Sequence, residues 1–222
     1  IIFIGTSHFA VPILKSLYQN GYPISVVYTQ PPKKSFRGQK INKSPIQSLS
    51  ETLSIESRTP ISLKKNKDEK NYLKKLNADI AIIVAYGQII PSDFLNFTKK
   101  GFINIHASLL PKWRGAAPIQ RSIMNLEKQT GISIMKISEK LDTGPICSSY
   151  TIELLENENT ESLSNRLSLL AAEKLPDEID AIFENKVIFK PQDHSQATYA
   201  NKVLKSEGKI DWSNSAKNII GK

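Results

Sequence analysis

Apolar positions along this 222-residue chain recur in two patterns, as short unbroken runs and as stretches with helical spacing. Apolar runs at 1–4 and 24–29 flank the amphipathic stretch 8–18, and together they predict a strand, a helix and a second strand. A further run at 79–88 is almost free of polar residues, as expected of a parallel strand covered on both faces. The pattern therefore predicts an α/β fold, with a Rossmann-like, mostly parallel sheet and helices on both faces.

The rest of the chain continues this alternation. We predict further helices at 44–53, 68–76, 89–97, 116–124 and 160–184, and further strands at 102–106, 131–137 and 146–154. Pro176 falls inside the last helix and should kink or split it near Lys174, because proline has no N–H and its ring crowds the preceding turn. The chain thus divides into one domain over residues 1–185 and a short C-terminal extension over 186–222.

Two polar side chains interrupt the apolar strand at 102–106. Asn104 and His106 stand two residues apart, so an amide and an imidazole leave the same face of this strand. The turn Ser108–Pro111 follows, and ligands of open α/β sheets usually bind at such a strand end. A histidine in this place is also often a purely structural group, so the residues alone leave both interpretations open.

The loop over 30–44 carries an unbalanced set of positive charges. Its five cations face no acidic residue within the loop and are Lys33, Lys34, Arg37, Lys40 and Lys43. Such a loop suits phosphate contacts that are salt-sensitive and independent of sequence, although a merely solvated loop has the same composition.

The overall composition bears on which molecules the protein could bind and on where in the cell it could work. A net charge of +9 attracts polyanions such as nucleic acid, but an AT-rich genome also enriches lysine and asparagine. The single cysteine, Cys147, excludes an internal disulfide framework and fits a reducing compartment, so we expect a cytoplasmic protein. No apolar run reaches the length of a membrane span, and no residues have metal-ligand spacing, so we expect neither a membrane nor a metal.

The segment NIHASLLPKWRGAAPIQRSI resembles the signature of the folate-dependent formyltransferases. Its WRGAAPIQ portion is most similar to the members that act on methionyl-tRNA, and the resemblance extends from IIFIGT at the start to IDWSNSA near the end. It implies transfer of a formyl group from 10-formyltetrahydrofolate to the amine of methionyl-initiator tRNA, by a monomer that needs no metal.

The resemblance also implies roles for particular residues. Asn104, His106 and Asp142, the last in the motif LDTGPI, fall on the catalytic positions of the family. These residue types suit the reaction, since an amide can donate to an oxyanion, an imidazole can exchange protons and a carboxylate can support the imidazolium. The implied tetrahydrofolate-binding residues are Ser108, Leu109, Leu110, Pro111, Tyr86 and Gly87, and the implied tRNA-binding residues are Arg37 and Lys40.

Two other functions are compatible with the same residues. A formyltransferase could act on a small amine, such as an amino sugar nucleotide or a purine precursor, or a basic RNA-binding module could keep the fold without catalysis. By resemblance, residues 1–185 are the catalytic domain and 186–222 lead towards a C-terminal domain that this sequence lacks.

Overall fold

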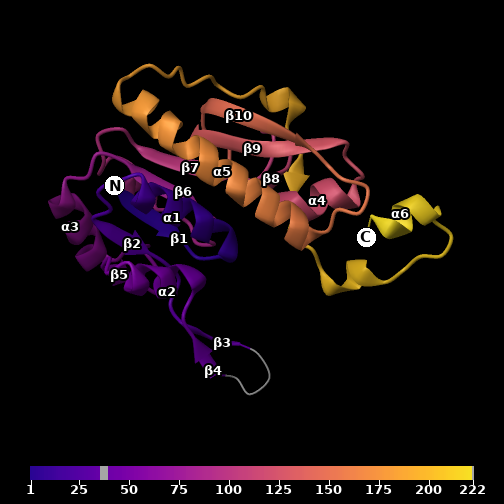
Figure 1. Ribbon diagram of the computed structural model, residues 1–222, viewed down its shortest axis with the longest axis horizontal. Helices are drawn as coiled ribbons and strands as arrows, with labels where there is room; N and C mark the ends of the chain where they lie inside the picture. The colour runs from indigo at the N-terminus through magenta and orange to yellow at the C-terminus, as the bar shows by residue number, and fades with distance from the viewer. Residues whose placement is uncertain (36–39, 222) are drawn as a thin grey trace.

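The structure is a computed structural model that describes residues 1–35 and 40–221. In this part of the chain seven strands form one sheet in the order β10-β9-β7-β6-β1-β2-β5 (Figure 1). The strands from β7 to β5 are parallel, and β9 and β10 are antiparallel to their neighbours. The strands are β1 Ile2–Gly5, β2 Val26–Tyr28, β5 Ser57–Arg58, β6 Ala81–Val84, β7 Phe102–His106, β9 Gln129–Lys136 and β10 Ile146–Glu153. The predicted α/β class and mostly parallel sheet are confirmed.

The helices lie on both faces of the sheet, as predicted. Their bounds are α1 Val11–Gln19, α2 Pro45–Thr52, α3 Lys67–Leu76, α4 Pro118–Met124, α5 Thr160–Phe183 and α6 Ala216–Ile220. Neighbouring strand residues alternate between two cores: Phe3 packs with α1, α2 and α5, whereas Ile4 packs with Leu73 of α3. Figure 1 shows the long α5 crossing the sheet in front of β7 and β6. This alternation is the period-two pattern of buried strands.

Helix α5 passes through Pro176 without a break, so the predicted split is wrong. Proline leaves the carbonyl four residues earlier, that of Ala172, without its helical N–H partner. The Ser16 hydroxyl of α1 donates to this carbonyl at 2.6 Å, and the Tyr22 hydroxyl donates to the Pro176 carbonyl at 2.9 Å. The Ser16 hydroxyl thus satisfies the backbone carbonyl that the proline leaves without a partner.

Two further predictions need correction. The predicted helix at 89–97 is wrong, since only Ser92–Phe94 form a 3₁₀ turn, which buries Phe94 beside Phe97. So short a segment after Pro91 cannot form enough helical hydrogen bonds to offset the cost of helix nucleation. The predicted loop at 30–44 contains the antiparallel strands β3 Lys33–Ser35 and β4 Lys40–Asn42.

The segment after α5 returns to the sheet. Lys190 exchanges two backbone hydrogen bonds with Ile146, the first residue of β10. Strand β11 Tyr199–Ala200 then pairs in parallel with β8 Arg114–Gly115. The predicted boundary at residue 185 stays a prediction, but residues 190–200 pack against the part of the sheet that carries the candidate chemistry.

A partly buried ionic cluster links β2, β5 and α3. Arg58 donates to both carboxylate oxygens of Glu69 at 2.8 and 2.9 Å, and the Tyr28 hydroxyl donates to the same carboxylate at 2.5 Å. Burial by itself raises the pKa of Glu69, but the hydrogen bonds from Arg58 and Tyr28 outweigh it and leave this pKa below its usual value. The carboxylate therefore stabilises the fold when it is ionised.

Glu69→Gln should lower the free energy of unfolding by about 2 kcal/mol at neutral pH, because charged hydrogen bonds are lost. A lowered folded-state pKa means that the contribution is complete above about pH 4.3, the value for an unfolded glutamate, and is lost as the pH falls further. Urea unfolding at pH 6.5 and at pH 3.5 measures this dependence. The difference between wild type and variant should shrink at the lower pH.

Glu51→Gln is the matched control, because Glu51 pairs with Lys43 while 46% of its side chain is exposed. An exposed pair of this kind contributes no more than ~1 kcal/mol. A wild-type advantage over Glu69→Gln that stays constant between the two pH values would show that the Glu69 charge does not stabilise the fold.

Candidate active site

Asn104 and His106 lie together on one face of β7. Ile103 and Ile105 point into the core under α5, so the alternating Asn104 and His106 face the other way. His106 lies opposite Ser133 of β9 in the strand register, and its side chain is largely buried. The sheet thus delivers an amide and an imidazole side by side, as the spacing predicts.

Asp142 reaches His106 from the turn between β9 and β10. Its Oδ2 atom lies 3.7 Å from Nδ1 of His106, and only 7% of the histidine and 11% of the aspartate side chain are exposed. This distance exceeds a hydrogen bond but lies within ion-pair range, and such a pair interacts strongly where water is scarce. The sequence separates these residues by 36 positions, and the fold brings them together.

The short strand β8 fixes both groups. The Trp113 carbonyl, which precedes β8, accepts a hydrogen bond from Nε2 of His106 at 2.9 Å. The Gly115 N–H donates to Oδ2 of Asp142 at 2.8 Å. A carbonyl can only accept, so Nε2 carries the proton in this contact and Nδ1 is the ring nitrogen left to exchange one beside Asp142.

Gly115 is required where it stands. Its φ of 121° is in the left-handed region, and a Cβ atom would lie 2.9 Å from the carbonyl oxygen of Ala200 in β11. Any other residue would therefore strain the backbone and push β11 away. The glycine lets β8 run close to β11 while its N–H holds Asp142.

Known proteins resemble this chain over its whole length. A family model described as formyl transferase matches residues 1–179. The methionyl-tRNA formyltransferase of Pelagibacter ubique (strain HTCC1062) is 64% identical over 222 residues, which are 100% of this chain and 72% of the relative. The chain belongs to the methionyl-tRNA formyltransferase family. The enzyme of the same name from Sulfurihydrogenibium sp. is 43% identical over 99% of this chain and 71% of its own length.

Solved structures share the fold of this formyltransferase at low sequence identity. An N-formyltransferase from Helicobacter canadensis, solved with folinic acid and dTDP-3-aminofucose, has a TM-score of 0.76 and 20% identity over 99% of this chain and 77% of that chain. Phosphoribosylglycinamide formyltransferase from Anaplasma phagocytophilum has a TM-score of 0.70 and 19% identity over 87% and 94%. At this identity the likeness establishes the fold alone.

The turn predicted to bind folate contains two kinds of side chain. Ser108 is buried, and its hydroxyl donates to the Lys112 carbonyl at 2.7 Å, while Leu110 is also buried. Leu109 and Pro111 instead line a cavity of about 990 Å³. The remaining lining residues of that cavity are Lys112, Trp113, Leu126, Glu127, Lys128, Gln129, Thr130, Glu153, Leu154 and Gln196. His106 and Asp142 do not line it.

Tyr86 and Gly87 follow β6, the neighbour of β7 in the sheet. The Tyr86 ring is buried in the core with α3, and the Tyr86 carbonyl accepts hydrogen bonds from Thr6 and Gln30. Gly87 has a φ of 76°, and a Cβ atom there would lie 2.4 Å from the Gln30 amide nitrogen. Any contact between a ligand and Tyr86 must therefore use the backbone of this turn.

The structure describes only part of the two residues predicted to contact tRNA. Arg37 lies outside the described residues, and Lys40 lies on β4 with its side chain outside the description. The roles of both residues stay predictions.

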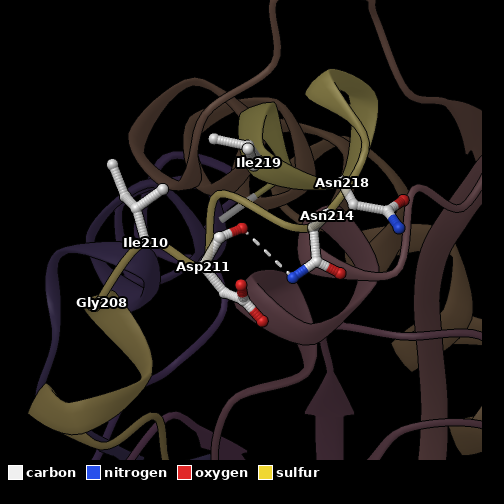
Figure 2. A pocket seen from close by; sticks show the side chains of 6 residues that line it. All are labelled: Gly208, Ile210, Asp211, Asn214, Asn218 and Ile219. Atoms are coloured by element: carbon white, nitrogen blue, oxygen red, sulfur yellow. Dashed lines mark hydrogen bonds between the residues drawn. The ribbon is translucent and has the colours of Figure 1, made fainter.

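A second cavity lies in the C-terminal segment (Figure 2). Its lining residues are Gly208, Ile210, Asp211, Asn214, Asn218 and Ile219. Asn214 donates to the Asp211 carbonyl at 3.3 Å across it, and none of the predicted site residues takes part.

No helix in the described part of the chain is both long enough and apolar enough for a bilayer crossing. No group of three histidine, cysteine, aspartate or glutamate side chains in this part of the chain could hold a metal ion.

Sequence reasoning missed the residues that support the site from the C-terminal side. Gln192 bonds both to the Asp142 turn and to Arg114, and the Thr198 hydroxyl accepts from the Trp113 N–H at 2.9 Å. No motif or periodicity distinguishes these residues, because they lie in a short irregular segment rich in polar side chains.

Proposed function

We propose that this chain transfers a formyl group from 10-formyltetrahydrofolate to the amino group of methionyl-initiator tRNA. The observation that carries the proposal is the approach of Asp142 to His106 at 3.7 Å, on the sheet face that also carries Asn104. The 64% identity to a methionyl-tRNA formyltransferase supports the choice of acceptor over other amines.

The reaction needs two proton transfers, and it needs the negative charge of an oxyanion to be stabilised. The methionyl amine attacks the formyl carbon, the carbonyl oxygen becomes an oxyanion, and the bond from carbon to the folate nitrogen breaks. The amine loses a proton and the leaving folate nitrogen gains one. No covalent bond to the protein forms, so no serine or cysteine nucleophile is needed.

Each of the three side chains suits one of these tasks. The Asn104 amide forms no hydrogen bond with the described residues, so it can donate to the oxyanion. Nδ1 of His106 takes the proton from the attacking amine and passes it to the leaving nitrogen, because the Trp113 carbonyl occupies Nε2. The Asp142 carboxylate stabilises the imidazolium that exists between these two proton transfers.

The folate is a substrate here, and two turns are placed to receive it. Residues 85–87 follow β6 and Ser108–Pro111 follow β7, and the two strands are neighbours. Turns at the carboxyl ends of adjacent parallel strands present backbone groups to a ligand between them. We propose that the pteridine ring binds between these turns, next to Asn104 and His106.

A formylation assay tests the function directly. Purified protein should convert methionyl-initiator tRNA to formylmethionyl-tRNA in the presence of 10-formyltetrahydrofolate. Formylation of an amino sugar nucleotide or a purine precursor, with no reaction on the charged tRNA, would favour the small-amine alternative. Absence of reduced-folate binding by titration calorimetry would favour an RNA-binding module without catalysis.

Arg37→Ala should weaken binding of initiator tRNA and make it less sensitive to salt. A cation that contacts a phosphate releases a counterion on binding, so its loss reduces the slope of log Kd against log salt by about 1. Filter binding between 50 and 200 mM salt measures the slope. The matched control is Lys15→Ala, which removes an exposed cation from α1. Equal slopes for Arg37→Ala and wild type would exclude a phosphate contact at Arg37.

A further inference from the structure

Gln192 is a buried amide in the segment that follows α5. Only 7% of it is exposed, although its neighbours Pro191 and Asp193 are exposed. It lies two residues after Lys190, whose backbone is bonded to the start of β10. An uncharged polar side chain so deeply buried requires hydrogen-bond partners for all its polar atoms.

The oxygen and nitrogen partners of Gln192 come from two separate segments, and Nε2 also lies 3.9 Å from the Met135 sulfur in β9. The Gln192 Nε2 atom donates to the carbonyls of Asp142 at 3.0 Å and Gly144 at 2.7 Å. Its Oε1 atom accepts from Nε and Nη2 of Arg114 at 3.1 and 2.6 Å. Both donors and both acceptor positions of the amide are therefore used.

The two segments are the ones that hold the catalytic pair. Arg114 belongs to β8, whose neighbour Trp113 binds the His106 ring and whose Gly115 binds the Asp142 carboxylate. Asp142 itself has a φ of 51°, a left-handed conformation that is uncommon for residues other than glycine and that contacts to its backbone help to hold. Gln192 links the Asp142 backbone to β8, because it bonds to the Asp142 carbonyl and to Arg114.

The chemistry of the contact explains why an amide stands here. A carboxylate at this position would place an oxygen against two carbonyl oxygens, and an apolar side chain would leave both carbonyls without their donor. Arg114 is 2% exposed, forms no ion pair in the described part of the chain, and is bonded instead to the neutral Gln192 and to Nδ1 of His194 at 2.9 Å. A glutamate would therefore keep the contact with Arg114, but it would lose both donors to the Asp142 turn and set a negative oxygen against its carbonyls.

We propose that Gln192 is a positioning residue for formyl transfer, which sets the Asp142 carboxylate against His106 through the backbone of the Asp142 turn. This rests on the proposed function for its effect on turnover. The geometric part of the proposal, the link from Gln192 to Asp142, does not depend on the substrate.

Two variants distinguish the hydrogen bonds with Arg114 from those with the Asp142 turn. Gln192→Met keeps the side-chain length and removes every hydrogen bond, whereas Gln192→Glu keeps the acceptors for Arg114 and removes the donors to Asp142 and Gly144. We expect kcat to fall on the order of 100-fold in both, because a displacement of about 1 Å at a reacting group has that effect. KM for the folate and for the tRNA should stay within about twofold of wild type, since Gln192 is buried and its polar atoms are bonded within the protein.

The matched control is Gln19→Met, at an exposed glutamine at the end of α1. It should keep the wild-type kcat and KM. A wild-type kcat in Gln192→Glu would overturn the proposal, because contact with Arg114 would then suffice. A rise in KM with unchanged kcat would also overturn it, since that pattern indicates lost binding and not displaced chemistry.

A second measurement needs no turnover. The Gly115 amide proton, which donates to the Asp142 carboxylate, should resonate downfield in the wild type and move upfield in Gln192→Glu, in the same direction as in Asp142→Ala. An unchanged Gly115 resonance in Gln192→Glu would overturn the link. If the wild type formylates no methionyl-tRNA while the Gly115 resonance moves as expected, the proposed function fails and the positioning by Gln192 stands.

Discussion

His106→Ala should lower kcat for formylation of methionyl-tRNA by about a thousandfold, the middle of the range for loss of a general acid–base group. The reason lies in how this ring is held. Trp113 occupies Nε2, so Nδ1 is the nitrogen that can give a proton to the leaving folate nitrogen beside Asp142. Asn104 cannot take over this role, because an amide side chain does not exchange protons in this pH range.

Single-turnover kinetics with saturating folate and charged tRNA measure this effect on the chemical step. His8→Ala is the matched control, because His8 is exposed in a 3₁₀ turn and outside the proposed machinery. It should leave the rate unchanged. Thermal unfolding of His106→Ala shows whether the variant is folded. A folded His106→Ala enzyme with the wild-type rate would remove His106 from the mechanism.

Asn104→Asp should lower kcat about 100- to 1000-fold, because the change replaces the oxyanion donor with a negative acceptor of the same shape. The loss should appear in kcat with little change in KM, since the interaction forms only in the transition state. The half-buried Asn104 amide has no hydrogen bond to the described residues. The substitution therefore removes no side-chain hydrogen bond, and the free energy of unfolding should change little.

Asn96→Asp is the control for charge, since Asn96 is exposed and the change adds the same negative charge. Equal losses in Asn104→Asp and Asn96→Asp would assign the effect to net charge and would contradict an oxyanion role for Asn104. Rate measurements at two salt concentrations separate the two effects further, because salt screens the exposed charge more strongly.

Most of the fold could be predicted from the apolar residues of the strands. Strands buried on both faces of a parallel sheet leave long apolar runs, so the alternation of strand and helix indicated the α/β class without further information. The same period of two placed Asn104 and His106 on one face, opposite Ile103 and Ile105. Local spacing suffices for such groups, because they belong to one strand.

Contacts between distant segments could not be inferred in this way. The effect of Pro176 was misjudged because the donor that replaces its missing N–H, Ser16, lies 160 residues earlier in the chain. Gln192 was missed for the same reason, since its partners lie in β8 and in the Asp142 turn. The approach of Asp142 to His106 was expected only through family resemblance, because a turn of nine residues, 137–145, decides where the carboxylate points.

The most direct test of the central claim is a crystal structure of this chain with a stable 10-formyl analogue of the folate donor. The formyl oxygen should lie within about 3 Å of the Asn104 amide nitrogen, with the folate nitrogen that carries the formyl group facing Nδ1 of His106 beside Asp142. A formyl group held out of reach of both Asn104 and His106, for example in the cavity lined by Leu109 and Thr130, would contradict the proposed mechanism.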